Sequence, residues 1–545
     1  MSALHRIFRT ATVLAVCLST GSAPAVEYYF TGTGAADNDW WATADNWSPN
    51  GNPGASAANG DVAIFDQSWS SRNTTNTHTP HHYLQELRFN TSGSWRLHNS
   101  VWDVYMNHTV AGENALFTQN GSGPVTLDCD LRFDDDTVFG GTGSGQVTIK
   151  GSVTAQHATY GPRNGAFGSE GLILNGSYTL ALENVAGYQG PTTINAGTLL
   201  FNAESAIVNP NWQTEPGTPW IPSTQGAVTV NSGGTLGGTG ILRAAVTVNS
   251  GGTFSPGVSP GVFTVESLTL AGGSNTLVEL GGATPGNGTG FHDQTNVTSQ
   301  LSLGGTLNVD LVGSYAPTAL STYTIFNYGS LDPGAGSFDT VNLPSYIPAA
   351  HPNWSWEIDY GTGTSSQVTV GLESNPWYFT AGSYPSGARN PWWATPDNWS
   401  YDGKPGFDSN NPDVVIFDDA HYSPDALAAL GNHQTNIHDV NPGYVKELRV
   451  NTASSWWFYN NSRTLAMKNA EAGQPALFTQ NGPGTVLVDS NLRLDSDTVF
   501  GGTGSGKVTV NGQQAAVHAT LGPRPGVFGA GGLTLDGNYT LESHL

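Results

Sequence analysis

The chain has 545 residues, of which 70 are glycine, 37% are hydrophobic and only 11% are charged. So few charges argue against a typical disordered protein, and so much glycine argues against a helical one. The net charge of −24 argues against nucleic-acid binding, which requires a basic surface. Short strands separated by glycine turns fit this composition best.

The first 25 residues have the pattern of a secretory signal peptide. Arg6 and Arg9 form the positive end, Ala11–Leu18 is an apolar run too short to span a bilayer, and Ala23-Pro24-Ala25 is a small-residue cleavage site. We predict an exported protein whose mature chain, without those two arginines, has a net charge of −26. That chain keeps only Cys129, which excludes an intramolecular disulfide, and it has no later segment apolar and long enough to insert into a membrane.

A long segment of the chain occurs twice. Residues 115–180 and 476–541 are identical at 43 of 66 positions without a gap, at an offset of 361. Upstream, WWATADNWSPNGNPG (40–54) recurs as WWATPDNWSYDGKPG (392–406) at an offset of 352. We therefore predict a duplicated module of about 350 residues whose second copy is truncated, because it stops where the first copy continues into further repeats.

A short repeat occupies the middle of the chain. AVTVNSGGTL (227–236) returns 18 residues later as AVTVNSGGTF (245–254), and TTINAGTLLF (192–201) has the same form. Alternating valines place one face of a strand inward, and Asn-Gly or Gly-Gly pairs suit the corners between strands. Such a small unit can bury its apolar face only against copies of itself. These features predict an all-β fold, a parallel β-solenoid, with a β-sandwich of hairpins as the competing interpretation.

The repeats and the duplication together predict five segments. These are a signal peptide (1–25), a tryptophan-rich first opening (26–180), the β-solenoid repeats (181–345), closing strands with a linker (346–375), and the second, truncated opening (376–545).

The repeat region resembles a known bacterial family. NVAGYQGPTTINAGTLLFN (184–202) and the segments 227–242 and 248–270 resemble the autotransporter-associated β-strand repeat, also called the passenger-associated transport repeat. Residues 303–344 are similar to the segment that closes such modules. The resemblance implies a right-handed parallel β-helix in an exported protein, extracellular or on the surface of a Gram-negative-type bacterium. It is informative about fold and nearly silent about activity.

We therefore expect an exported structural or adhesin-like protein without catalytic activity or cofactor. The alternative is a polysaccharide-binding or polysaccharide-processing β-helix protein, with polysaccharide or cell-surface components as partners. It depends on tryptophans that recur in the two openings, because aromatic faces stack on sugar rings. The candidate sugar-binding residues are Trp40, Trp41, Trp47, Trp392, Trp393 and Trp399. Packing at the end of the solenoid is the other interpretation of these tryptophans.

Two further patterns have both a chemical and a structural interpretation. Residues 257–261 (GVSPG) match the G-x-S-x-G nucleophile motif, but Pro260 has no N–H for an oxyanion hole, so we predict a turn. The aspartates Asp134, Asp135 and Asp136, and in the second copy Asp495 and Asp497, indicate solvated turns, with an adventitious calcium site as the alternative.

Histidines provide the last candidates. His78, His81 and His82 correspond to His421, His433 and His438 at different spacings, which favours polar loops over a zinc site. HATYGPR (157–163) and HATLGPR (518–524) offer a base and an anion clamp, but we favour a structural loop.

Overall fold

The computed structural model describes most of the chain beyond the predicted signal peptide. The described residues are 25–32, 41–66, 74–76, 82–98, 103–110, 112–155, 170–207, 221–222, 224–361, 366–380, 393–401, 403–421, 433–436, 442–459, 463–511, 514–516, 533–537 and 540–543. The chain divides into two compact units. The first is Met1–Glu279, Pro285–Val309 and Phe326–Asn342, and the second is Leu280–Thr284, Asp310–Ile325 and Leu343–Leu545.

Two sheets build the first unit. Sheet 1 contains β1 (Glu27–Phe30), β2 (Trp47–Ser48), β3 (Asp61–Phe65), β5 (His82–Phe89), β7 (Asp103–Met106), β8 (Ala115–Gln119), β10 (Asp130–Phe133), β11 (Thr137–Gly140), β13 (Val153–Ala155), β14 (Leu172–Leu174), β16 (Val185–Gly187), β17 (Thr192–Ile194), β19 (Glu204–Ile207), β20 (Ile221–Pro222), β21 (Val228–Val230), β23 (Ile241–Val248), β25 (Val262–Leu270), β27 (Gln294–Leu303) and β29 (Thr322–Gly336). Sheet 2 contains β4 (Thr74–Asn76), β6 (Trp95–His98), β9 (Val125–Leu127), β12 (Val147–Ile149), β15 (Thr179–Leu182), β18 (Gly197–Phe201), β22 (Gly234–Gly238), β24 (Thr253–Pro256), β26 (Asn275–Leu280), β28 (Thr306–Leu311) and β30 (Thr340–Asn342).

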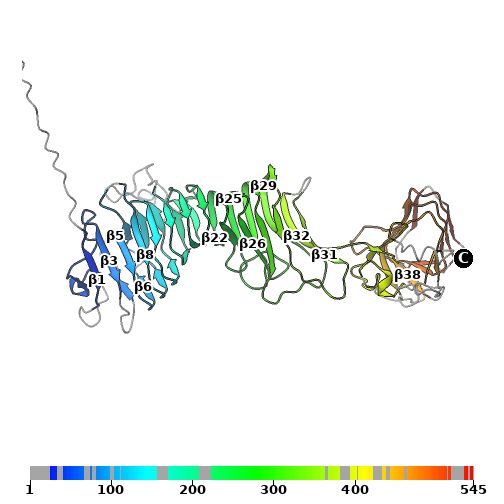
Figure 1. Cartoon of the computed structure of the whole chain (residues 1–545), viewed down its shortest axis with the longest axis horizontal. Coiled ribbons are helices and arrows are strands. Elements are labelled where there is room, and N and C mark those ends of the chain that lie inside the picture. Colours follow the sequence, from blue (N-terminus) through cyan, green and yellow to red (C-terminus); the bar gives the residue numbers. More distant parts are fainter. Residues whose placement is uncertain are drawn as a thin grey trace, which may run out of the picture. The chain divides into compact units, whose positions relative to one another are not determined.

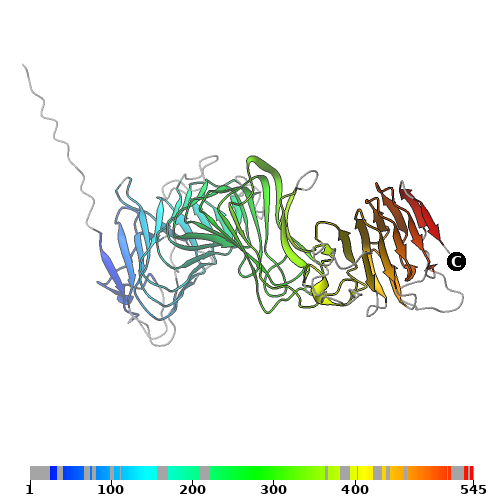
Figure 2. The same ribbon diagram turned by 45° about the vertical axis from the view of Figure 1, so that its right-hand side comes forward.

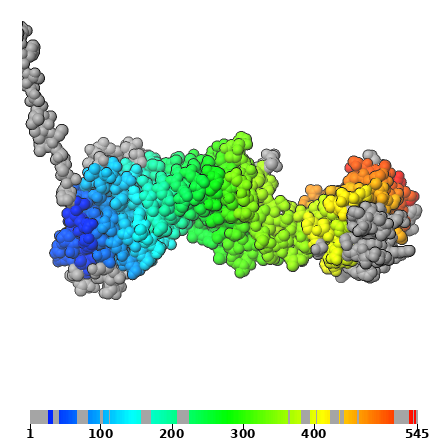
Figure 3. Space-filling model, in the orientation of Figure 1, coloured from blue at the N-terminus to red at the C-terminus, as the bar shows by residue number. Residues whose placement is uncertain are grey.

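The chain passes repeatedly between these two sheets. After β12 it runs through β13 and β14 of sheet 1 to β15 of sheet 2, and then through β16 and β17 to β18. We call each such passage a coil. Figure 1 shows β3, β5 and β8 of successive coils side by side, in agreement with their parallel pairing. The space-filling view of the first unit shows consecutive bands of colour from blue to green, because residues close in sequence lie on neighbouring coils (Figure 3).

The 18-residue repeat forms two adjacent coils in register. Val228, Thr229 and Val230 of β21 pair in parallel with Val246, Thr247 and Val248 of β23, and Leu236 of β22 pairs with Phe254 of β24. The asparagines of the turns form a hydrogen-bonded column, with Nδ2–Oδ1 distances of 2.8 Å from Asn249 to Asn231, 2.7 Å from Asn231 to Asn195 and 2.8 Å from Asn195 to Asn175. Identical turns therefore recur because each coil is stacked on the one before it.

Alternation along the strands fills the interior. Phenylalanines of β3, β5, β8 and β11 form a column in which Phe65 and Phe89 have ring centroids 4.9 Å apart, Phe89 and Phe117 5.7 Å, and Phe117 and Phe139 5.1 Å. All four side chains are fully buried. The column shows how a coil that is too thin to enclose a core alone contributes one layer of a shared core.

Two sheets and a hairpin build the second unit. Sheet 3 contains β33 (Trp377–Tyr378), β34 (Asp413–Asp418), β36 (Gly443–Asn451), β38 (Thr464–Met467), β39 (Ala476–Gln480), β41 (Asn491–Leu494), β42 (Thr498–Gly502), β44 (Gln514–Ala516) and β45 (Leu533–Gly537). Sheet 4 contains β35 (His433–Asn436), β37 (Trp456–Tyr459), β40 (Val486–Val488), β43 (Val508–Val510) and β46 (Leu541–Ser543). Strands β31 (Trp354–Asp359) and β32 (Gln367–Ser374) form the antiparallel hairpin, and β32 also pairs with β29 of sheet 1. Figure 2 shows the strands of this unit, yellow to red, side by side.

The second copy repeats the pairing of the first. Glu86 pairs with Leu116 between β5 and β8, and Glu447 pairs with Leu477 between β36 and β39, at the offset of 361 predicted from the sequence. Each opening also has one short 3-10 helix, η1 (Ala44–Asn46) and η2 (Pro396–Asn398), just before a buried tryptophan. The duplication is therefore structural as well as sequential.

The fold is nearly all β with long parallel sheets, which is consistent with the predicted β-solenoid. A β-sandwich of hairpins would require antiparallel pairs, but among the described residues the repeat strands β21–β28 pair in parallel apart from the isolated bridge between Gly238 and Gly257. No helix in the described ranges is long and apolar enough to span a membrane. The limits of the five predicted segments remain predictions.

Candidate functional site

The first opening buries two of its predicted sugar-binding tryptophans. Trp41 is 0% exposed and Trp47 is 1% exposed. The Trp47 indole donates to the Trp41 carbonyl oxygen at 2.7 Å, and the Trp41 indole donates to the Pro53 carbonyl oxygen at 2.9 Å. Their rings pack edge to face at 4.9 Å and both contact Phe65. The two tryptophans close the turn around η1 over the first layer of the core.

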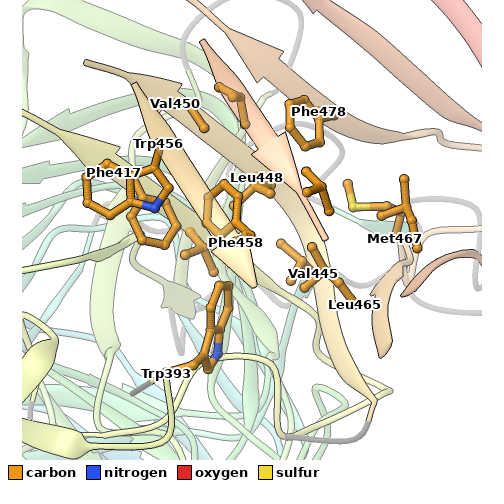
Figure 4. Packing of buried hydrophobic residues seen from close by; sticks show 14 of the residues in the cluster. Trp393, Phe417, Val445, Leu448, Val450, Trp456, Phe458, Leu465, Met467 and Phe478 are labelled. Carbon is orange, nitrogen blue, oxygen red and sulfur yellow. The ribbon is translucent and has the colours of Figure 1, made fainter. Parts of the chain in front are cut away.

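The second opening repeats this arrangement. The Trp399 indole donates to the Trp393 carbonyl oxygen at 2.7 Å, and the Trp393 indole donates to the Pro405 carbonyl oxygen at 2.9 Å. Both side chains are at most 2% exposed. Figure 4 shows Trp393 in the cluster of apolar side chains that includes Phe417 and Trp456, whose ring centroids are 4.8 Å apart.

The burial of these four tryptophans bears on the two interpretations that the sequence left open, sugar binding and packing. A sugar ring needs an exposed aromatic face, and neither Trp41 and Trp47 nor Trp393 and Trp399 has one in this structure. Their burial favours the packing interpretation. Trp40 and Trp392 lie outside the described residues, so for them the sugar-binding hypothesis stays a prediction.

The G-x-S-x-G match is the turn predicted from Pro260. It connects β24 to β25, and the N–H of Gly261 donates to Asp293 Oδ1 at 2.6 Å. The other carboxylate oxygen of Asp293 accepts the Glu279 N–H at 2.8 Å. Asp293 is 1% exposed, and burial raises its pKa to about 7 in spite of these two hydrogen bonds. Sequence inspection singled out the serine but overlooked the carboxylate that holds the turn.

The clustered aspartates also hold backbone. Asp135 Oδ2 accepts the His108 N–H and Asp136 Oδ1 accepts the Gly171 N–H, both at 2.7 Å. In the second copy, Asp495 forms two hydrogen bonds with Arg493, at 2.6 and 2.7 Å. In the described part of the chain, no group of three His, Cys, Asp or Glu side chains is arranged to hold a metal ion.

The candidate histidines are dispersed. His82 is fully buried with its ring 4.9 Å from that of Trp41. His421 stacks on Tyr378 at 3.9 Å and contacts Asp418 at 2.9 Å. His433 belongs to β35, while His78, His81, His438 and the segments 157–163 and 518–524 lie outside the described residues.

A cavity of about 460 Å³ lies in the second unit, between the turn before β31 and the loop after η2. Phe407 is 65% exposed beside it, and the Lys404 ammonium lies 5.9 Å from the Phe407 ring centroid. The lining residues are Ala349, Ala350, His351, Pro352, Gly403, Lys404, Phe407 and Asp408. The cavity combines an apolar wall with one cation and one carboxylate, so it can accept a small ligand with an apolar face and a polar edge.

The ionisable groups of the cavity are held in place. The His351 ring stacks on Trp354 at 4.0 Å, and its Nε2 lies 3.6 Å from Asp408 Oδ2. Burial lowers the pKa of His351, although the Asp408 charge acts in the opposite direction. Burial would raise the pKa of Asp408, but hydrogen bonds, including those from Asn410 and Asn411, outweigh burial and lower it. The carboxylate is therefore the charged partner.

The first opening has no counterpart of these groups. At the offset of 352, Lys404, Phe407 and Asp408 replace Asn52, Ala55 and Ser56. This contrast was visible in the sequence, but the other wall, residues 349–352, is about 50 residues away and is brought close only by folding.

Comparison with known proteins relates part of the chain to an adhesin. A stretch of 184 residues is 30% identical to the protein described as "Adhesin BmaC autotransporter" of Brucella suis biovar 1 (strain 1330). The alignment covers 33% of this chain and 5% of the adhesin, so the chain matches a small part of that protein's length. No protein-family model matches the chain.

Proposed function

We propose that this chain is an exported, right-handed parallel β-helix of the autotransporter-associated repeat type. It acts on a bacterial surface, or after secretion, as an adhesin-like scaffold without catalytic activity. The observation that supports this most directly is the stack of in-register parallel coils in a chain partly similar to an autotransporter adhesin. Stacked coils provide length, and the turns between strands provide contacts.

The roles of the charged groups support a scaffold over an enzyme. Asp61 Oδ2 accepts the Gly54 N–H at 2.9 Å in the first opening, and Asp413 Oδ2 accepts the Gly406 N–H at 2.6 Å in the second. Asp293 holds a turn in the same way. These buried carboxylates, the groups that would be candidates for acid–base chemistry, are each engaged in fixing backbone.

Adhesion is the property to test. Beads coated with residues 26–545 would be washed at calibrated flow over surfaces of cell envelopes, polysaccharides and matrix glycoproteins. We expect retention on at least one surface well above that of beads coated with an unrelated protein of similar pI, and competition by the free chain. Retention equal to the control on every surface would contradict an adhesin-like role.

The absence of catalysis is tested separately. The same polysaccharides, incubated with the chain, should release no new reducing ends or unsaturated products. Product that accumulates in proportion to protein concentration would favour the carbohydrate-processing alternative.

A further inference from the structure

One tryptophan of the second opening faces outward. Strand β37 places Trp456 and Phe458 inside, at 1% and 0% exposure, and therefore directs Trp457 and Tyr459 to the outer face of sheet 4. Trp457 is 38% exposed, and its ring centroid lies 5.2 Å from that of the half-buried Tyr459. The second unit thus presents an aromatic pair on the outer face of a sheet.

Polar side chains of the next two coils flank this pair. The Trp457 indole N–H donates to Asp489 Oδ2 at 2.6 Å, and Asn511 Nδ2 donates to Asp489 Oδ1 at 2.7 Å. Asp489 follows β40 and Asn511 follows β43, so three successive strands of sheet 4 contribute. The carboxylate orients the indole ring, and the remaining lone pairs and N–H of Asp489 and Asn511 are available for hydroxyl groups.

The first copy shows that the fold does not need this tryptophan. At the offset of 361, Arg96 occupies the Trp457 position and forms an ion pair with Asp128, the counterpart of Asp489. The outward position paired with Trp457 on β40 is Leu487, where the first copy has Thr126. Both copies therefore have the strand and the aspartate. The first copy has an arginine at the outward position, whereas the second has Trp457 beside the apolar Leu487.

We propose that Trp457, Tyr459, Asp489 and Asn511 form a binding platform for a neutral glycan chain. The apolar face of a pyranose ring would stack on Trp457, while its hydroxyls would bond to Asp489 and Asn511. The proposal rests on the adhesin-like function and names the ligand class for it.

Charge and size favour this ligand over others. Polyanionic glycans are disfavoured by Asp489 and by the net charge of −24. A protein partner is disfavoured because one indole and the half-buried Leu487 provide far less than the roughly 800 Å² per partner that a stable interface buries.

The duplication supplies the matched variants. Trp457→Arg recreates the ion pair that the first copy already accommodates, so it removes the ring and keeps a partner for Asp489. Arg96→Trp makes the reverse change next to Asp128. Residues 26–545 and both variants would be titrated with a soluble β-glucan, an α-glucan and a galactomannan, and tested in pull-downs with chitin and with the polyanion alginate.

We expect the wild-type chain to bind at least one neutral glycan and Trp457→Arg to weaken that binding by about tenfold or more, the size expected for loss of an aromatic stacking contact. Arg96→Trp should add a weaker second site for the same glycan, and alginate should show no binding that depends on Trp457. No binding to any neutral glycan, or equal binding by wild type and Trp457→Arg, would overturn the proposal.

Oxidative footprinting of the unmodified chain keeps the test decisive if a variant does not fold. A bound neutral glycan should slow oxidation of Trp457 and leave oxidation of the exposed Phe407, which lies outside the platform, unchanged. Equal oxidation of Trp457 with and without glycan overturns the platform. The bead assay separates the two hypotheses. Retention unaffected by Trp457→Arg and by neutral glycan refutes the platform but not adhesion, whereas no retention at all refutes adhesion itself.

Discussion

The two openings of this protein share a turn closed by buried tryptophans and differ at outward-facing positions. Inside, Trp41 and Trp393 have the same position and the same indole hydrogen bond. Outside, Arg96 has become Trp457, and the first copy lacks the cavity group Phe407. A substitution at a buried position disturbs the side chains packed around it, whereas an outward-facing side chain of a stacked coil can be replaced without such an effect. We infer that the two copies share the scaffold and differ in the contacts that their outer faces offer.

Removing a buried tryptophan should be the most damaging change. Trp41→Ala and Trp393→Ala should each lower the free energy of unfolding of their own unit by about 3 to 5 kcal/mol, because each leaves a large cavity. Hydrogen exchange followed by mass spectrometry reports the peptides of each unit separately. If either variant loosens both units to the same extent, the two units do not unfold independently.

Raising the pH should destabilise the two units over different ranges. The pKa of Asp293 in the first unit is raised to about 7 and that of Asp413 in the second to about 6, in both cases mainly by burial. A carboxyl whose folded pKa exceeds its unfolded value of about 4 stabilises the fold at low pH and loses this contribution as the pH rises through the folded pKa.

We therefore expect the loss to end near pH 7 in the first unit and near pH 6 in the second. It should be on the order of 4 and 3 kcal/mol, respectively. Denaturant titrations from pH 4 to pH 8 measure it. Asp293→Asn should flatten the profile of the first unit only, and an unchanged slope in that variant would show that another group is responsible.

Glycine at one corner should be required equally in both copies. A Cβ on Gly121 would lie 1.9 Å from the Thr91 carbonyl oxygen, and one on Gly482 would lie 1.9 Å from the Thr452 carbonyl oxygen. Gly121→Ala and Gly482→Ala should therefore each cost about 1 to 3 kcal/mol, because two coils must separate. Gly140→Ala is the control, since its Cβ would meet nothing closer than 3.9 Å. Thermal unfolding of the three variants measures these losses of stability. If Gly121→Ala and Gly482→Ala melt at the same temperature as Gly140→Ala, the close approach of the coils at this corner does not require glycine.

The outward exchange should have the smallest effect on stability. Trp457→Arg should change the free energy of unfolding of the second unit by less than about 1 kcal/mol, as is usual for an exposed ion pair. The stabilising effect of the new pair should decrease at high salt. A loss as large as that of Trp393→Ala would mean that Trp457 belongs to the core.

The sequence predicted the architecture well because the fold is repetitive. Val228 and Val246 lie in adjacent coils as the 18-residue echo implies. Which tryptophans are exposed was harder to predict, because recurrence in a duplicated segment does not tell a core position from a surface one. The adjacent pair Trp456-Trp457 did indicate that one of the two tryptophans faces outward, because neighbouring residues in a strand point to opposite faces of the sheet. The cavity at Phe407 could not be predicted, because its walls are joined only by tertiary packing.

The asparagine column described above implies that repeats can be gained or lost only as whole coils. One coil adds roughly 4.8 Å, the spacing between neighbouring strands, and inserts its own asparagine between those above and below. A duplication or deletion of a whole repeat, such as the 18 residues from 227 to 244, rejoins the column with the same partners on both sides. Insertion or deletion of only part of a repeat would put another residue at the turn position and interrupt the asparagine column. The number of coils between the two openings can therefore change during evolution without changing the side chains of either opening.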